Sequence, residues 1–263
     1  MAEIILEARN LRKEFGGLVA VDDVSIAVTD GSVHSIIGPN GAGKTTLFNL
    51  LSGRYKPTTG EVFFKGANIS DVPVHGRALM GIGRSFQITN IFPNLTVLEN
   101  VRLAVQAHSN VNFQIFRRAV TFKAFIERAD EVLELVGLTR ERDLTANLLP
   151  HGGKRKLELA IIIAGDPKLL LLDEPTAGMA SEQVPELMET IDRVRKEGNK
   201  TIVLVEHNMS VVMGVSDKIT VMNLGRLLSE GTPEEIAHDQ IVQKVYLGEL
   251  YGSADEMMGG RDG

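Results

Sequence analysis

Hydrophobic and polar positions follow a strand-like period in the N-terminal part of the chain. Over roughly the first 65 residues, short apolar or alternating runs are separated by Gly, Asp and Pro, which is typical of β-strands joined by turns. The pattern predicts strands over residues 4–8, 24–28, 33–37 and 61–65, with one helix over residues 44–52. This part of the chain is therefore expected to be mainly β-structure.

A helical period replaces this pattern between residues 95 and 136. Apolar residues such as Val132, Leu133 and Val136 recur there at helical spacing, with charged residues between them, and the segment carries no strand signal. We therefore expect a helical subdomain inserted into an α/β core.

Strands and helices alternate in the rest of the chain. The expected helices cover residues 151–164, 181–196 and 208–213, and the expected strands cover residues 168–172, 201–205 and 219–223. A further helix should begin at Thr232-Pro233-Glu234-Glu235, with Thr232 as its N-cap. Such alternation predicts a mostly parallel sheet that helices cover on both faces.

Composition and charge narrow the classes of function. The 263 residues suffice for one large domain or a core with a subdomain. With 28 Lys+Arg against 34 Asp+Glu, the net charge is −6, which does not suit sequence-independent binding of nucleic acid. The basic run Lys154-Arg155-Lys156 is accordingly interpreted as a solvated helix face. The chain has no cysteine, which excludes disulfides, thiolate nucleophiles and cysteine-ligated metal centres.

The sequence offers no membrane segment and no leader. No apolar run approaches the ~18 to 20 residues that a membrane helix needs. The first residues, MAEIILEARN, lack a charged-then-apolar leader with a cleavage site. We expect a cytoplasmic protein that reaches a membrane only through another protein.

The strongest chemical motif is Gly38-Pro39-Asn40-Gly41-Ala42-Gly43-Lys44-Thr45, here called the phosphate loop. It matches the phosphate-binding pattern G-x-x-x-x-G-K-[ST], and it lies between an expected strand and an expected helix. Its glycines let successive N–H groups point at phosphates, and the following helix, from Thr46 onward, adds its positive end. Lys44 should reach the β- and γ-phosphates, and the Thr45 hydroxyl should bind Mg²⁺.

A second motif, Leu169-Leu170-Leu171-Leu172-Asp173-Glu174, ends in two carboxylates. Four consecutive leucines fit a strand buried on both faces, so that Asp173 lies at its carboxyl end, where open α/β sheets bind ligands. Asp173 is expected to hold Mg²⁺, and Glu174 is placed to accept a proton from an attacking water.

With these motifs, the chain resembles the nucleotide-binding subunits of ATP-binding-cassette (ABC) transporters over nearly its whole length. The resemblance implies ATP and Mg²⁺ as cofactors and gives roles to three further residues. Gln87 resembles the glutamine that senses Mg²⁺ and the membrane partner, and it counts as both a nucleotide and a metal contact. His207 resembles the histidine that contacts the γ-phosphate, and Phe15 resembles the aromatic residue that stacks on adenine.

The resemblance also implies a fold. It is a P-loop NTPase (RecA-like) α/β core with a mostly parallel sheet, an N-terminal antiparallel β subdomain and an inserted α-helical subdomain. The core with its β subdomain is expected to cover residues 1–93 and 156–250, and the helical subdomain residues 94–155. Residues 251–263 are expected to form a flexible tail.

One segment departs from the family pattern. The family usually shows L-S-G-G-Q before a helix, whereas this chain has Leu149-Pro150-His151-Gly152-Gly153, here called the signature segment. Proline replaces the serine whose hydroxyl is expected to meet the γ-phosphate in a partner subunit, and proline donates no hydrogen bond. The backbone N–H groups of this helix start can still face an anion. The segment therefore either works in trans with weaker contacts or is degenerate.

Further segments resemble the ATPases of branched-chain amino-acid importers. They are listed here: Phe15-Gly16-Gly17, residues 86–97, residues 113–136, Arg155-Lys156-Leu157-Glu158 and Tyr246-Leu247-Gly248-Glu249. Importers of urea or short amides share most of them. The ATPase does not touch the transported solute, so its sequence leaves that solute open.

The resemblance implies an importer ATPase on the cytoplasmic face of the membrane. The chain carries one phosphate loop and one signature segment, so a second ATPase chain, either a copy or a paralogue, must complete each site. Transmembrane permease subunits and, indirectly, a periplasmic binding protein are the other implied partners. The alternatives are a lipid-transport or export ATPase, a soluble ABC protein acting on DNA or ribosomes, and a P-loop kinase.

Overall fold

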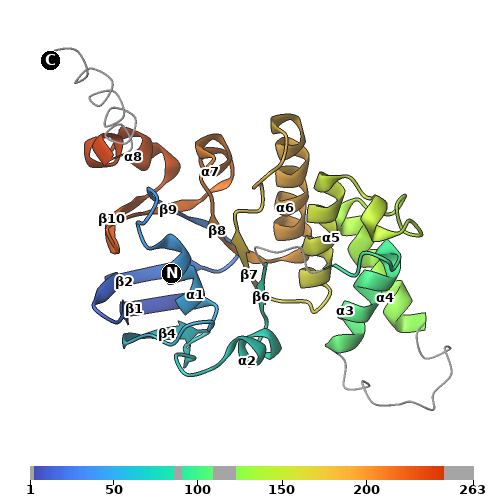
Figure 1. Ribbon diagram of the computed structural model, residues 1–263, viewed down its shortest axis with the longest axis horizontal. Helices are drawn as coiled ribbons and strands as arrows, with labels where there is room; N and C mark the ends of the chain where they lie inside the picture. Colours follow the sequence, from blue (N-terminus) through green and yellow to red (C-terminus); the bar gives the residue numbers. More distant parts are fainter. Residues whose placement is uncertain (1–2, 86–90, 109–122, 246–263) are drawn as a thin grey trace, which may run out of the picture. The chain divides into compact units, whose positions relative to one another are not determined.

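The computed structural model describes residues 3–85, 91–108 and 123–245 (Figure 1). Its chain forms two compact units. The first comprises Met1–Asp71 and Leu204–Gly263, and the second comprises Val72–Val203.

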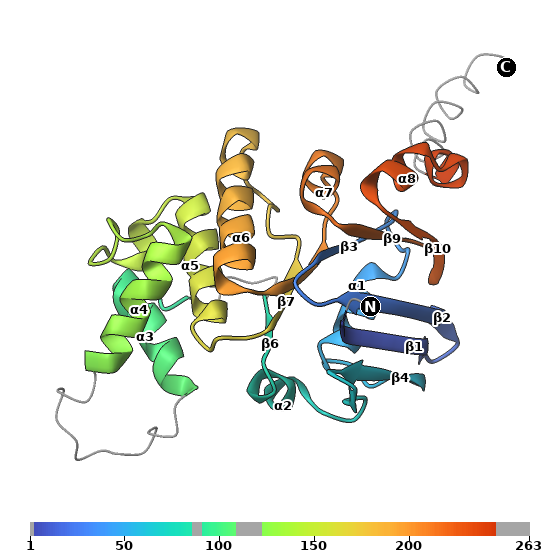
Figure 2. The ribbon, with the colours of Figure 1, turned by 180° about the vertical axis from the view of Figure 1, so that it is seen from behind.

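An antiparallel sheet begins the first unit (Figure 2). It contains β1 (Ile4–Phe15), β2 (Leu18–Thr29), β4 (Thr59–Phe64) and β5 (Ala67–Asn68), in the order β2-β1-β4-β5. The alternation that predicted residues 24–28 is confirmed, because Val24, Ile26 and Val28 are buried. Strands β1 and β2 are longer than predicted. Register shifts in the pairing of β1 with β2 interrupt the alternation of apolar and polar residues after Ala8. The sequence pattern therefore did not predict the rest of β1.

A second group of strands in the first unit carries the phosphate loop. Strand β3 (Val33–Ile37) pairs in parallel with β9 (Lys218–Asn223), which pairs antiparallel with β10 (Arg226–Gly231). Helix α1 (Lys44–Leu51) follows the loop. The sequence analysis did not predict β10, most of whose side chains are only half-buried.

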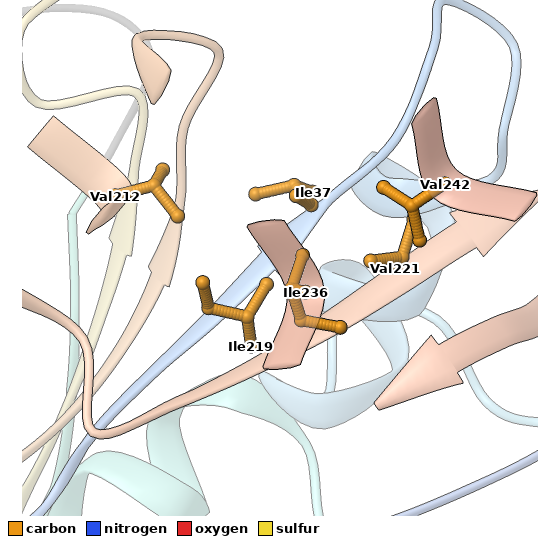
Figure 3. Packing of buried hydrophobic residues seen from close by; sticks show 6 residues of the cluster. All are labelled: Ile37, Val212, Ile219, Val221, Ile236 and Val242. Atoms are coloured by element: carbon orange, nitrogen blue, oxygen red, sulfur yellow. The ribbon is translucent and has the colours of Figure 1, made fainter. Parts of the chain in front are cut away.

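Helices α7 (Met209–Val215) and α8 (Pro233–His238) contribute to the core of this unit. Figure 3 shows that core, where side chains from β3, β9, α7 and α8 and from the segment after α8 meet. Its members are Ile37, Val212, Ile219, Val221, Ile236 and Val242. The predicted start of α8 is confirmed, because the Thr232 hydroxyl accepts from the Glu235 N–H and the Glu235 carboxylate accepts from the Thr232 N–H.

The second unit combines short parallel strands with a group of helices. Strand β6 (Ile82–Arg84) pairs in parallel with β7 (Leu169–Asp173), whose other neighbour is β8 (Thr201–Val205). Strand β8 crosses the boundary of the units, since its first three residues belong to the second. Strand β7 is buried at every position, as the four leucines predicted.

Five α-helices of the second unit lie within its described residues: α2 (Val74–Leu79), α3 (Val97–Ala107), α4 (Lys123–Val136), α5 (His151–Ile163) and α6 (Val184–Gly198). Short 3₁₀ turns cover Ala146–Leu148 and Ser181–Gln183. Helices α3 and α4 lie side by side in both views (Figures 1 and 2). They fall where the helical period predicted helix, and the proposed bounds of a helical subdomain at residues 94–155 stay a prediction. In the part of the chain that the structure describes, no helix has both the length and the apolar character needed to cross a bilayer.

Candidate functional site

The phosphate loop is shaped by close approaches that only glycine permits. It connects the fully buried strand β3 to α1, with Gly43 as the helix cap at φ 95°. A Cβ atom on Gly43 would lie 2.5 Å from the carbonyl oxygen of Ala20, and one on Gly38 would lie 2.2 Å from that of Met222. Both distances are shorter than any van der Waals contact, so the sequence pattern of the loop follows from its packing.

Lys44 lies inside this loop. Its side chain is buried, and its Nζ donates to the carbonyl oxygens of Gly38, at 2.5 Å, and Pro39, at 2.9 Å. The ammonium group is therefore held at the start of α1, where the helix dipole also favours an anion. Asn40, Gly41 and Thr45 are exposed, Thr46 is half-buried and Ala42 is buried. This cradle suits a chain of phosphates.

Phe15 ends β1 and is 42% exposed. Its ring meets that of Tyr55 edge to face, with centroids 5.3 Å apart and planes at 74°. The Nζ of Lys13 lies 5.2 Å from the Phe15 ring centroid and donates to the carbonyl oxygen of Lys56. Phe15 is thus an exposed aromatic ring held by its neighbours, which suits stacking on a base.

His207 follows β8 and is exposed. The carboxylate of Glu206, which is buried, accepts from the backbone N–H groups of His207, at 2.9 Å, and Asn208, at 3.3 Å. Asn208 then caps α7. The backbone at His207 is therefore fixed on both sides while its side chain faces outward, where it can meet a ligand.

Asp173 and Glu174 lie at the end of β7. Asp173 is buried, and its N–H donates to the Ser85 hydroxyl at 2.8 Å, which in turn is placed by the Ser85 N–H donating to Leu171. Glu174 is half-buried and has a φ of 47°, a left-handed conformation uncommon outside glycine. Such backbone strain is concentrated at functional sites. The predicted position of Asp173 at the carboxyl end of a buried strand is confirmed.

The signature segment leads into α5. Leu149 is buried and Pro150, which is exposed, is the helix cap, with an extended conformation and no side-chain hydrogen bond to the helix. His151 is exposed, and Gly152 and Gly153 are half-buried. The helix start therefore faces outward without a side chain that caps its N–H groups.

The interpretation of Lys154-Arg155-Lys156 as a solvated face is wrong for two of the three residues. Lys156 is buried, with its Nζ 2.6 Å from the carboxylate of Glu186. Arg155 is half-buried, pairs with Glu158 and donates to the carbonyl oxygen of Ala177 at 3.2 Å. Long basic side chains bury their aliphatic stems when their charged ends find partners, which charge counting does not reveal.

The two units divide the predicted site residues. The phosphate loop, Phe15 and His207 belong to the first unit, and Asp173, Glu174 and the signature segment belong to the second. Gln87 lies outside the described residues. The sequence analysis gave no role in the site to Ser85 or Arg155, which line one pocket together with Asp173. Ser85 stands two positions before Gln87, and nothing in its local sequence marks the contact with β7.

Strand, glycine loop and helix in this order define a phosphate-binding α/β protein. The family model described as ABC transporter matches residues 21–177, and a model described as branched-chain amino acid ATP-binding cassette transporter matches residues 226–251. The high-affinity branched-chain amino acid transport ATP-binding protein LivG of Salmonella typhimurium is 40% identical over 256 residues, covering 95% of this chain and 100% of that protein.

One further relative and one solved structure are also similar to this chain. The lipopolysaccharide export system ATP-binding protein LptB of Haemophilus influenzae is 34% identical and covers 94% of this chain and 98% of its own. A solved ATP-binding cassette of an ABC transporter, in its ADP conformation, superposes with a TM-score of 0.81 at 29% identity, covering 93% of this chain and 99% of that one. The chain therefore belongs to the ABC transporter family, as an ATP-binding and ATP-hydrolysing subunit. The predicted α/β P-loop NTPase fold is confirmed.

Proposed function

We propose that this chain is the ATPase subunit of an importer for branched-chain amino acids. The observation that carries the proposal is the match of residues 226–251 to the model described for branched-chain amino acid cassettes, together with the full-length similarity to LivG. LptB, a protein of an export system, also matches over nearly the same length, at 34% identity. The match at residues 226–251 is therefore the observation that favours import.

In the proposed site, the phosphate loop binds the triphosphate of ATP. Backbone N–H groups of residues 38–46, except Pro39, which has none, surround the phosphates. Lys44 exchanges the two loop carbonyls that it now contacts for β- and γ-phosphate oxygens. Phe15 stacks on adenine. The fit of the loop to this ligand is supported by the glycines at positions 38 and 43, where a Cβ atom would collide with the backbone.

Mg²⁺ fits the oxygen donors that the chain offers. The Thr45 hydroxyl and the Asp173 carboxylate are hard oxygen ligands of the kind that Mg²⁺ prefers, and Gln87 is the third residue proposed to reach it. The ion would neutralise charge on the phosphates when bound. Asp173 is held for this role by the hydrogen bond between its N–H group and Ser85.

Hydrolysis requires a proton acceptor beside the attacking water. Glu174 takes the proton of that water as its oxygen bonds to the γ-phosphorus, and the bond from that phosphorus to the ADP oxygen breaks. His207 steadies the γ-phosphate by hydrogen bonding. The support for these roles is the chemistry of the residue types and the family membership of the chain.

A second ATPase subunit completes each site in the proposal. The signature segment, residues 149–153, covers ATP held by the other subunit, so two chains close over two nucleotides and open after hydrolysis. Gln87 and the segment around it pass this movement to transmembrane permease subunits, at the cytoplasmic face of the membrane. A periplasmic solute-binding protein would take part indirectly.

The experiment that tests the function uses the complete chain. Purified protein should retain MgATP, and turnover should rise when permease subunits encoded beside it are added. Glu174→Gln should lower turnover by about a hundredfold or more while ATP binding persists. Glu182→Gln, at an exposed carboxylate of the same unit, is the matched control and should leave turnover unchanged. Unchanged turnover in Glu174→Gln would refute its role as the base.

A transport assay decides the substrate. Vesicles containing the assembled permease should take up leucine in an ATP-dependent manner, whereas uptake of urea or extraction of lipid would favour the alternatives. The expectation of a branched-chain amino acid fails if a solute-binding protein encoded beside the chain binds urea or a short amide instead.

A further inference from the structure

The turn between β9 and β10 has an unusual backbone. Asn223 and Arg226 pair across it, so the loop contains only Leu224 and Gly225. Both have positive φ, 48° and 79°, which is the conformation of a tight hairpin turn that matches strand twist. Leu224 is 82% exposed, whereas Gly225 is buried. The turn therefore presents a leucine to solvent and presses a glycine against the rest of the first unit.

One side of this turn contacts the phosphate loop. The N–H of Gly225 donates to the carbonyl oxygen of Ala42 at 3.0 Å. A Cβ atom on Gly43 would lie 3.3 Å from the Cα of Gly225. The carbonyl oxygen of Met222, the last β9 residue but one, occupies the space beside Gly38. The loop is thus supported at three of its residues by the end of β9 and the turn.

The other side of the turn contacts β2. The Asp22 N–H donates to the carbonyl oxygen of Gly225 at 2.8 Å, and the Arg226 guanidinium donates to the Asp22 carboxylate at 2.5 and 2.9 Å. The Arg226 hydrogen bond holds the pKa of the Asp22 carboxyl below its usual value. A Cβ atom on Gly225 would lie only 3.0 Å from the carbonyl oxygen of Ala20.

This stretch of β2 lies beside the end of β1 that carries Phe15. Val21 pairs with Lys13 and Val19 with Glu14, and Leu18 pairs with Phe15 itself. The turn therefore touches the phosphate loop on one side and, on the other, the β1–β2 hairpin, which carries Phe15. Both contacts pass through Gly225, whose N–H and carbonyl groups are used in opposite directions.

We propose that the turn at residues 223–226 is a positioning element for the nucleotide, which holds the phosphate loop and the β1–β2 hairpin in one arrangement. The inference rests on the proposed binding of ATP by Lys44 and Phe15. It adds that nucleotide affinity depends on a segment that touches no nucleotide. Gly225 is required because a side chain would push the turn away from Ala20 and shift one contact relative to the other.

The test compares two glycines with nearly the same backbone conformation. Gly225 has φ +79° with the Ala20 backbone at close range, and Gly66, in the β4–β5 turn, has φ +77° with nothing within 4 Å. Alanine at either position meets the same backbone strain, so Gly66→Ala controls for strain alone. We expect Gly225→Ala to weaken MgATP binding and to raise KM by about tenfold, with kcat at saturating ATP within about threefold. Gly66→Ala should leave Kd and KM within about twofold of the natural chain.

Equal Kd values in the two variants would overturn the inference, whether both stay tight or both weaken. If the natural chain itself fails to bind MgATP, the proposed function fails and the inference falls with it, which is a different result.

Arg226→Ala gives a second measurement should Gly225→Ala not fold. Arg226 pairs with Asp22, which also pairs with Arg12, and the control is the surface pair of Arg9 with Glu7 on β1. We expect Arg226→Ala to weaken MgATP binding by only about threefold, because surface ion pairs contribute little. Arg9→Ala should have no effect on MgATP binding, because Arg9 does not contact the turn. Identical affinities in these two variants would also contradict a positioning role for the turn.

Discussion

Two helix starts in this chain are proposed to face phosphates, and they are built differently. Helix α1 begins after the phosphate loop, where Gly38 and Gly43 are fixed by backbone atoms at distances no side chain could share. Helix α5 begins after Pro150, where a Cβ atom on Gly152 would meet only the ends of two side chains, Met179 at 3.6 Å and Gln183 at 3.7 Å, all at ordinary contact distance. Contacts within the chain therefore fix the backbone at the start of α1, whereas they leave the start of α5 accessible.

This difference explains where the sequence departs from its family. A side chain added at Gly38 or Gly43 of the phosphate loop would collide with backbone atoms of the same unit. At the signature segment, Pro150 is exposed, so the fold constrains its side chain little. The proposed ligand of this segment lies in another subunit. Pro150 can therefore replace serine without disturbing the fold, since proline suits the extended conformation found there.

The largest difference between the two helix starts is expected when a basic residue is removed from each. Lys44→Ala should weaken MgATP binding by about a hundredfold or more, because it deletes a buried ammonium aimed at the phosphates. Lys154→Ala, in the first turn of α5, should leave binding of the chain's own nucleotide unchanged. Filter binding or a fluorescent nucleotide measures both, with circular dichroism to show that each variant is folded. Similar losses in both variants would refute the distinction.

Glycine-to-alanine changes should act in opposite directions at the two helix starts. Gly43→Ala places a methyl group 2.5 Å from a carbonyl oxygen at φ 95°, and we expect it to lower the free energy of unfolding by about 2 to 4 kcal/mol. Gly152→Ala adds a methyl group at ordinary contact distance inside a helix and should raise it by about 0.5 kcal/mol. Urea titration of both variants measures the two free energies. A destabilised Gly152→Ala would show that α5 is as tightly specified as α1.

Local sequence predicted the parts of the site whose chemistry is written in consecutive residues. The phosphate loop and Asp173 were found because strand, turn glycines and the acidic strand end each leave a contiguous pattern. The same holds for β3, β7 and β8, which are buried at every position and read as short apolar runs.

Contacts between distant residues could not be predicted in this way. The hydrogen bond between Gly225 and Ala42 and that between Asp173 and Ser85 join segments far apart in the sequence. Strand β10 is half-buried and β6 has three residues, so neither leaves a clear period. The burial of Lys156 depends on Glu186, a partner that no window around Lys156 contains.

A buried histidine in the strand that precedes the phosphate loop offers a test by pH. His34 lies on β3, and its Nε2 is 2.7 Å from the Thr220 hydroxyl, which itself donates to Glu230. The hydroxyl proton is thus used, so His34 donates from Nε2. Burial lowers the pKa of His34 to about 4, against the attraction of Glu230 and with the repulsion of Lys218.

The sign of the effect follows from this lowered pKa. Between pH 6.5 and about 4, the unfolded chain binds a proton that the folded chain does not, so stability falls as the pH falls. Relative to His34→Gln, the natural chain should lose up to about 3 kcal/mol of unfolding free energy across that range. Denaturant titrations at several pH values measure the difference, and parallel curves for the two proteins would contradict the assignment.

The smallest effect should come from restoring serine at the open helix start. In Pro150→Ser, the hydroxyl can accept from an N–H group of the first turn of α5, where Pro150 makes no side-chain hydrogen bond, and should stabilise the helix by about 1 kcal/mol. Pro150→Ala removes the proline ring without supplying a hydroxyl and is the matched control. Steady-state ATPase activity with the transmembrane partners should differ between the two variants by less than about threefold, because backbone N–H groups at the start of α5 already face the anion. A gain of about tenfold or more in Pro150→Ser would instead show that the signature segment is degenerate and that its serine hydroxyl is needed.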